Sequence, residues 1–118
     1  MSIGVNFYKD VKLIKHDEKY CSWNELRYID NQDTSWSAGN IIRLANIFFK
    51  YTNKELPIVL YEYEDNCLNN LIQPKDMIKY CDKVLNNANN EELEEFGYKI
   101  RYIKEMSEKG YYVSYDCE

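Results

Sequence analysis

Hydrophobic residues recur so densely between positions 36 and 51 that a helix formed by this segment would keep only a narrow polar stripe. The strongly polar positions are spaced three, three and four residues apart: Asn40, Arg43, Asn46 and Lys50. That spacing places all four side chains on one side of a helix. Because so little of its surface is polar, we expect this helix to lie in the middle of a domain, with the other elements packed around it.

Shorter hydrophobic patterns predict strands near both ends of the chain and in its middle. Residues 3–8 alternate between apolar and other side chains, the period of a half-buried strand. A second apolar run, 11–14, either extends that strand or returns beside it as a hairpin. Residues 57–63 predict a strand that begins with a proline, and 111–115 predict a final short strand.

Polar segments fill the region between the first strands and the long helix. Residues 17–25 predict a loop, and 26–29 a short strand. Residues 30–35 predict a turn, in which one of three residues caps the long helix: Asp33, Thr34 or Ser35.

Two further helices are predicted in the second half of the chain. Pro74 suits the first turn of one helix, whose apolar face is formed by Met77, Ile78, Cys81, Val84 and Leu85. The asparagine-rich residues 86–90 predict a loop, with Asn90 capping the last helix. Gly110 ends that helix, whose inward side chains are Leu93, Phe96, Ile100, Ile103 and Met106.

These elements predict a small α+β fold, with residues 1–118 as a single domain. Three main helices are expected to pack on a short, mainly antiparallel sheet. The strands near the two ends of the chain either pair with each other or flank the strand at 57–63.

The net charge of the chain indicates which kinds of partner it can bind. The net charge is −5 and the isoelectric point is near 5.0, which argues against direct binding to nucleic-acid phosphates. An acidic protein of this kind suits the cytoplasm, or contact with a basic protein surface. The sequence contains no secretion signal, and no apolar run approaches the roughly 18 residues of a membrane span, so neither secretion nor membrane insertion is expected.

The search for catalytic chemistry gives no candidate residues. The chain contains no phosphate-binding glycine loop, no zinc-protease motif and no nucleophile elbow. Its four cysteines form no C-x-x-C pair, and His16 is the sole histidine, in a charged run. We therefore expect reduced thiols, no metal site, no cofactor and no enzymatic activity.

One segment combines aromatic and acidic side chains in the way of a binding surface, at Tyr61, Glu62, Tyr63, Glu64 and Asp65. Rigid aromatic rings beside carboxylates make good contacts with a partner rich in arginine or lysine. The alternative is that the two tyrosines pack beneath the last helix and the acids only solubilise the strand.

A second candidate site lies on the long predicted helix. A cation on a mostly buried helix needs an internal carboxylate or a ligand anion, so Arg43 has one of these two roles. Together with Trp36 and Asn40 it defines a possible pocket for a phosphorylated or nucleotide-like ligand.

Five segments together resemble a family of small phage and prophage proteins. In that family an opening similar to M-G-L-D-x-Y precedes a tryptophan-led helix, an acidic turn, a helix of the form L-x-x-C-x-x-V-L and an aromatic strand. The corresponding segments of this chain are residues 1–9, 36–49, 64–67, 77–85 and 110–115. The resemblance implies a phage or prophage setting, with an anti-defence role, and transfers no catalytic residue.

Two classes of function follow from these observations. The first is an acidic phage or prophage protein that inhibits a host defence protein by contact, for example by blocking a nuclease's basic nucleic-acid-binding surface as an anti-CRISPR protein does. An immunity protein that neutralises a bacterial toxin would act in the same way, by contact with its partner. The second class is a small-ligand-binding protein or enzyme with a pocket near Arg43.

Overall fold

The computed structural model of the chain describes residues 2–10, 12–56, 58–59 and 72–116, and every structural statement below concerns these residues. Along the chain the elements are β1 (Ser2–Lys9), β2 (Lys12–Glu18), β3 (Cys21–Arg27), β4 (Asp30–Ser37), α1 (Ala38–Thr52), β5 (Ile58–Val59), α2 (Pro74–Asn87), α3 (Asn90–Glu108) and β6 (Tyr111–Asp116). The α+β class and the three main helices are confirmed.

Four strands form the main sheet in the order β4-β1-β6-β5. The central strands β1 and β6 pair antiparallel, with Phe7 opposite Val113, so the strands near the two chain ends pair with each other. β4 lies antiparallel on the far side of β1, and β5 is parallel to β6. The predicted strand at 57–63 is observed as β5; Pro57 and residues 60–63 lie outside the described residues.

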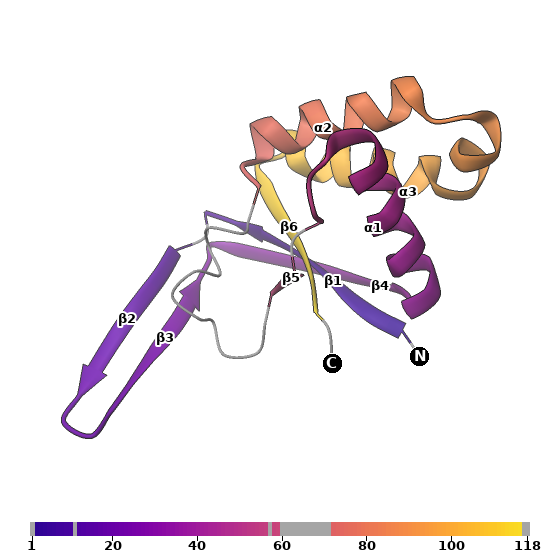
Figure 1. Ribbon diagram of the computed structural model, residues 1–118. Coiled ribbons are helices and arrows are strands. Elements are labelled where there is room, and N and C mark those ends of the chain that lie inside the picture. Colours follow the sequence, from indigo (N-terminus) through magenta and orange to yellow (C-terminus); the bar gives the residue numbers. More distant parts are fainter. Residues whose placement is uncertain (1, 11, 57, 60–71, 117–118) are drawn as a thin grey trace.

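The three helices cover one face of this sheet (Figure 1). The core lies between the two layers, because alternate residues of β1 and β6 point toward buried residues of all three helices. Its sheet side contains Val5, Phe7, Tyr111 and Val113, and its helix side contains Ile41, Leu44, Phe48, Met77, Cys81, Val84, Phe96, Ile100, Ile103 and Met106. The inward faces predicted for the second and third helices are therefore largely confirmed.

Among the described strands, β2 and β3 pair only with each other, and they form a hairpin that projects from the domain (Figure 1). The prediction of a loop at 17–25 was wrong, and the run at 11–14 neither extends β1 nor pairs with it. The physical reason is exposure. A hairpin that projects from the domain does not cover the main core, so its strands need no apolar alternation, which is the signal by which a strand is recognised.

The turn predicted at 30–35 was also wrong, because this segment belongs to β4 and pairs with the whole length of β1. Its polar residues have low strand propensity, but β4 lies at the edge of the sheet, where polar side chains remain in water. Trp36 is therefore on this strand, opposite Ile3, and not on the helix. The helix cap is Ser37, whose hydroxyl accepts a hydrogen bond from the Asn40 backbone N–H at 3.3 Å.

Helix α1 does not lie in the middle of the domain, so that expectation was wrong. Ile41, Leu44 and Phe48 are buried, but Ile42 is 59% exposed and Phe49 is 48% exposed. The helix packs on the core with one face and presents an apolar face to solvent. Of its polar residues, Asn40 is half-buried, and Arg43, Asn46 and Lys50 are exposed.

The asparagine-rich loop predicted at 86–90 is shorter than expected. α2 continues to Asn87, and α3 begins at Asn90. The cap of α3 is Asn89, one residue before the predicted one: its side-chain oxygen accepts from the Glu92 N–H at 2.8 Å, and the Glu92 carboxylate accepts from the Asn89 N–H at 3.0 Å. This reciprocal capping box satisfies two backbone donors of the first turn.

Candidate functional site

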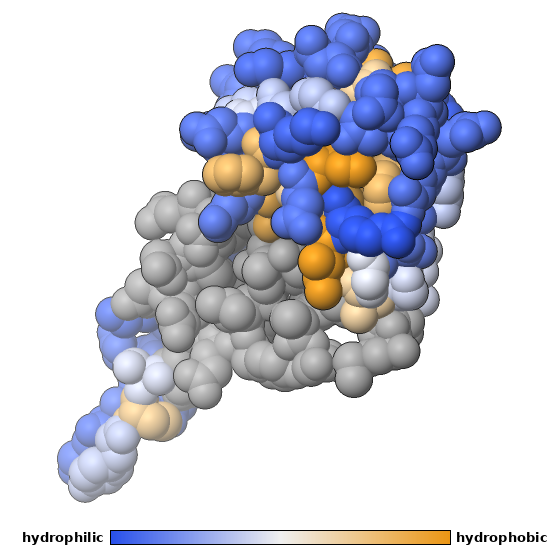
Figure 2. All heavy atoms as spheres, turned by 45° about the vertical axis from the view of Figure 1, so that its right-hand side comes forward, coloured by the Kyte–Doolittle hydropathy of each residue, from blue (hydrophilic) through white to orange (hydrophobic). Residues whose placement is uncertain are grey.

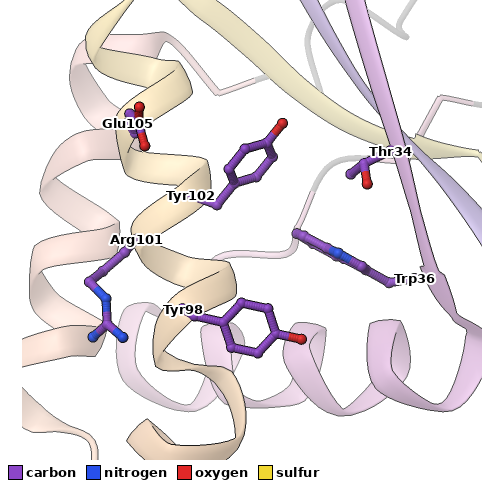
Figure 3. A pocket seen from close by; sticks show the side chains of 6 residues that line it. All are labelled: Thr34, Trp36, Tyr98, Arg101, Tyr102 and Glu105. Atoms are coloured by element: carbon purple, nitrogen blue, oxygen red, sulfur yellow. The ribbon is translucent and has the colours of Figure 1, made fainter.

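A groove runs between β4 and α3 and is walled by aromatic rings (Figure 3). Trp36 projects from β4, and Tyr98 and Tyr102 lie one turn apart on the facing side of α3. The ring centroids of Trp36 and Tyr102 are 6.4 Å apart, in an edge-on arrangement at 71°. The groove has a volume of about 420 Å³, and its lining is Thr34, Trp36, Tyr98, Arg101, Tyr102 and Glu105.

The sheet and the helix fix this arrangement for simple geometric reasons. Positions 98, 101, 102 and 105 are spaced three or four residues apart, so they lie on one side of α3. Tyr102 is held from behind by an edge-to-face contact with Phe7 of the core, with ring centroids 5.3 Å apart. The aromatic wall therefore stands on rigid elements rather than on a loop.

A buried cation lies close to two of these rings, although it is not among the residues that line the groove. Lys99 is only 3% exposed, and its Nζ lies 4.5 Å from the ring centroid of Tyr98, 5.6 Å from that of Trp36 and 5.7 Å from that of Phe96. Such contacts are attractive because the ring face is electron-rich. Within the described part of the chain no carboxylate forms an ion pair with Lys99. Among the described residues, its ammonium group therefore lies against aromatic rings.

Arg101 supplies a second cation, which is turned away from the three rings (Figure 3). Its guanidinium lies over Gly97, where a Cβ atom would come within 3.2 Å of it. No ion pair between Arg101 and another described residue holds it there. Glu105 lies one turn further along α3, and its carboxylate forms an exposed ion pair with Lys109 at 3.6 Å.

The three residues of the predicted helix site are only partly brought together. Trp36 lines the groove, but Arg43 and Asn40 do not. Arg43 forms an ion pair with Glu95 on α3, and its guanidinium carbon lies 5.6 Å from the Phe96 ring centroid. Of the two roles open to Arg43, the internal carboxylate is therefore the one observed.

The other predicted surface, formed by Tyr61, Glu62, Tyr63, Glu64 and Asp65, lies outside the described residues. Sequence reasoning missed the groove residues of α3. The available signal was the recurrence of Tyr98 and Tyr102 at one-turn spacing on the side of the helix opposite its apolar face.

A second candidate surface lies on α1; we call it the α1 surface and define it by the exposed Ile42 and Phe49 and by Ala45 between them, which is half-buried and also packs against the core. Their spacing of three and four residues forms one continuous stripe over two turns. Figure 2 shows hydrophobic side chains at the molecular surface with hydrophilic ones around them. Arg43 and Lys50 lie beside the stripe and are paired with Glu95 and Glu92.

The projecting hairpin offers two further features. Tyr20, between its strands, is 90% exposed. At its base a cavity of about 550 Å³ is lined by Asp10, Lys12, Arg27, Tyr28, Ile29 and Tyr112. Charges of both signs line this cavity, so its chemistry does not select one class of ligand.

Within the described ranges, the thiol of Cys21 is exposed and that of Cys81 is buried. The same ranges contain no group of three or more His, Cys, Asp or Glu side chains able to hold a metal ion. Burial, with a smaller contribution from Asp82, raises the pKa of the Cys81 thiol to about 12, so this thiol stays protonated and unreactive at neutral pH. None of the helices in this part of the chain is both long and apolar enough to cross a bilayer.

The chain matches no protein-family model, no curated protein and no solved structure.

Proposed function

We propose that the protein acts by binding another protein through the α1 surface, and that this contact inhibits the partner. The observation that carries the proposal is the exposure of Ile42 and Phe49 on a helix whose neighbouring face already fills the core. Ile41, Leu44 and Phe48 are buried there, whereas Ile42 and Phe49 lie between that face and the polar stripe and remain largely in water. Contiguous exposed apolar residues bordered by polar ones are typical of protein–protein contacts.

The charge around α1 indicates the character of the partner. Arg43 and Lys50 are neutralised by carboxylates of α3. Glu91 and Glu94 are exposed at the start of that helix and form no ion pair with another described residue. With a net charge of −5 for the chain, long-range attraction favours a partner with a basic surface.

The finer proposal is that this partner is a host defence protein, such as a nuclease, met in a phage or prophage setting. A basic nucleic-acid-binding surface attracts an acidic protein for the same reason that it attracts phosphate. Occupying that surface would exclude the nucleic acid and so inhibit the partner. This view is supported by the chain's acidity and by its resemblance to small phage proteins.

The experiment is capture of a partner from extract of the bacterial host, followed by reconstitution with the purified partner. We expect the wild-type protein to bind at one-to-one stoichiometry and to inhibit the partner's activity on nucleic acid. The double variant Ile42→Asp, Phe49→Asp should lose binding while remaining folded. The matched control is Tyr20→Asp, which places the same charge at an exposed aromatic position on the hairpin tip.

The surface predicted from sequence is tested in parallel with Glu62→Lys, Glu64→Lys, Asp65→Lys. If this triple variant loses binding and the α1 variant retains it, contact occurs through residues 61–65 and the α1 proposal is wrong. If neither variant changes the affinity, both surfaces are excluded.

A further inference from the structure

We infer that the outer edge of β4 binds an extended segment of another protein, which adds to the sheet as a further strand and alternates apolar with basic side chains. This binding is independent of the contact proposed above, because the α1 surface lies on a different element. Three features of β4 point to it: an unpaired backbone edge, the groove beside it and the charge of its outer face.

The backbone of β4 forms a long and uninterrupted edge. Its eight residues pair with β1 from Ser37 opposite Ser2 to Asp30 opposite Lys9, without a bulge, and among the described strands β1 is its only neighbour. In an antiparallel pair, every second residue of an edge strand directs its N–H and C=O groups away from its neighbour. Proline, lysine or a bulge commonly protects such an edge, and the sequence of β4, DNQDTSWS, has none of them. The edge can therefore accept another strand through backbone hydrogen bonds.

The groove lies on the helix side of this edge. Thr34 is opposite Val5 of the core, so Thr34 and Trp36 belong to the face of β4 that is directed toward the helices. Both line the groove, with Tyr98 of α3 on its other side (Figure 3). Side chains on the same face of an added strand would lie about 5 Å from those of β4. The aromatic lining and the volume of about 420 Å³ suit apolar side chains at these positions.

The opposite face of β4 determines the charge of the segment. Asp33 and Ser35 alternate with the groove residues and are exposed. Asp33 forms no ion pair with another described residue, and β4 contains no lysine or arginine. A cation opposite Asp33 on an added strand gains a favourable cross-strand pair, and the net charge of −5 attracts such a segment at longer range.

The same charge argues against a second copy of this chain as the occupant. Pairing of β4 with β4 of another copy would bring the aspartates of two acidic strands to one edge. Like charges on neighbouring strands are destabilising. The edge therefore fits a basic segment of a different protein, with apolar side chains toward the groove and cations toward Asp33.

The test uses a seven-residue peptide that alternates lysine with leucine as the probe, and the fluorescence of Trp36 as the readout. The chain contains two tryptophans, so a Trp23→Phe background leaves Trp36 as the sole reporter. We expect a saturable change in fluorescence on addition of this peptide. A peptide that alternates glutamate with leucine should bind about tenfold more weakly or worse, because its charge has the wrong sign.

Methylation of the peptide's backbone amides tests for strand pairing. Successive amides of a strand point in opposite directions, so those of the leucines and those of the lysines cannot both bond to β4. Methylating one of these two sets should weaken binding by about tenfold or more, and methylating the other set should have little effect. Side-chain contacts alone would not distinguish the two sets.

Two substitutions connect binding to the assigned residues. Asp33→Lys and Tyr98→Ala should each weaken binding of the lysine–leucine peptide by about tenfold. Their matched controls are Asp17→Lys, at an exposed acid on strand β2, and Tyr20→Ala at the hairpin tip, and both should bind the peptide as the wild type does. A thermal unfolding curve for each variant shows whether a loss of binding reflects a loss of fold.

Several results would overturn the inference. Absence of saturable binding rejects the site, as does equal binding of the lysine and glutamate peptides, and equal effects of the two methylations would show that no strand is added. Loss of peptide binding in the Ile42→Asp, Phe49→Asp protein would place the peptide on the α1 surface. A dimer of the protein alone whose dissociation constant changes with Asp33→Lys, measured by sedimentation, would show that a second copy occupies the edge.

Discussion

Tyr51 at the end of α1 donates a hydrogen bond to the carboxylate of Glu92 in the first turn of α3. The same carboxylate accepts the backbone N–H of Asn89 at 3.0 Å and pairs with Lys50 at 3.2 Å. One side chain thus caps its own helix and ties it to another. The bonds from Tyr51, then Asn89 and Lys50, lower the pKa of Glu92 below its ordinary value, although partial burial opposes the shift.

Replacing Glu92 with glutamine should therefore destabilise the protein at neutral pH, by about 1–2 kcal/mol. The pKa of Glu92 is lower in the folded than in the unfolded state, so the stabilisation is full above the unfolded pKa and is lost as the pH falls through the folded one. Urea unfolding at neutral pH and at about pH 3 should show the difference between wild type and Glu92→Gln shrinking in acid. Glu94→Gln, an exposed neighbour, is the control, and an equal effect there would contradict the assignment.

Two adjacent phenylalanines of α1 should respond very differently to truncation. Phe48 is completely buried in the core, whereas Phe49 belongs to the α1 surface. Phe48→Ala is expected to cost about 3–5 kcal/mol of unfolding free energy, through lost burial and a cavity, and Phe49→Ala only about 0.5 kcal/mol. Chemical denaturation of the two variants measures this. Similar losses would mean that Phe49 is packed inside the domain and is not available to a partner.

Two glycines should give opposite results when changed to alanine. Gly97 lies inside α3, and the added Cβ meets only the flexible end of Arg101, so Gly97→Ala should stabilise by roughly 0.5–1 kcal/mol. Gly110 ends the helix with φ +90, a backbone conformation that costs alanine about 1–2 kcal/mol. Thermal unfolding distinguishes the two. A destabilised Gly97→Ala protein would show that the position of Arg101 over Gly97 is rigid.

Thiol labelling should separate the two described cysteines. Cys21 on the hairpin is exposed, whereas Cys81 is buried in the core with a pKa of about 12. In a background with Cys67→Ser and Cys117→Ser, a thiol reagent at neutral pH is expected to modify Cys21 in the native protein and Cys81 only after unfolding. Modification of Cys81 at a rate close to that of Cys21 would be incompatible with its burial.

The elements that could be predicted from sequence are those whose pattern is imposed by the core. Alternation at residues 3–8 and one-turn spacing along α2 and α3 arise because buried positions must be apolar. The hairpin from Lys12 to Arg27 and the strand β4 follow no such rule, since a sheet edge and a ribbon that projects from the domain accept polar residues. Their pairing is decided by neighbouring strands, which a local pattern does not reveal.

The candidate site was predictable only in part for a related reason. Trp36 stood out as a large aromatic residue, but its position before Ser37 gave no sign that it would lie on a strand. Tyr98 and Tyr102 lie on the side of α3 that local periodicity assigns to solvent. They line a groove only because β4 lies beside α3 in the folded protein, and local sequence patterns do not reveal which elements become neighbours. The α1 surface was visible as excess apolarity and was wrongly interpreted as burial.

The pairing of β1 with β6 also has a consequence for how the chain reaches its native state. Phe7 and Val113 are neighbours in the central pair although roughly 100 residues separate them, so closing this pair carries the entropy of a very long loop. Helices can form early from local contacts, but the face on which they pack is incomplete until the two distant strands meet. We therefore expect slow folding relative to helical proteins of similar size, with the apolar faces of the helices transiently open to aggregation.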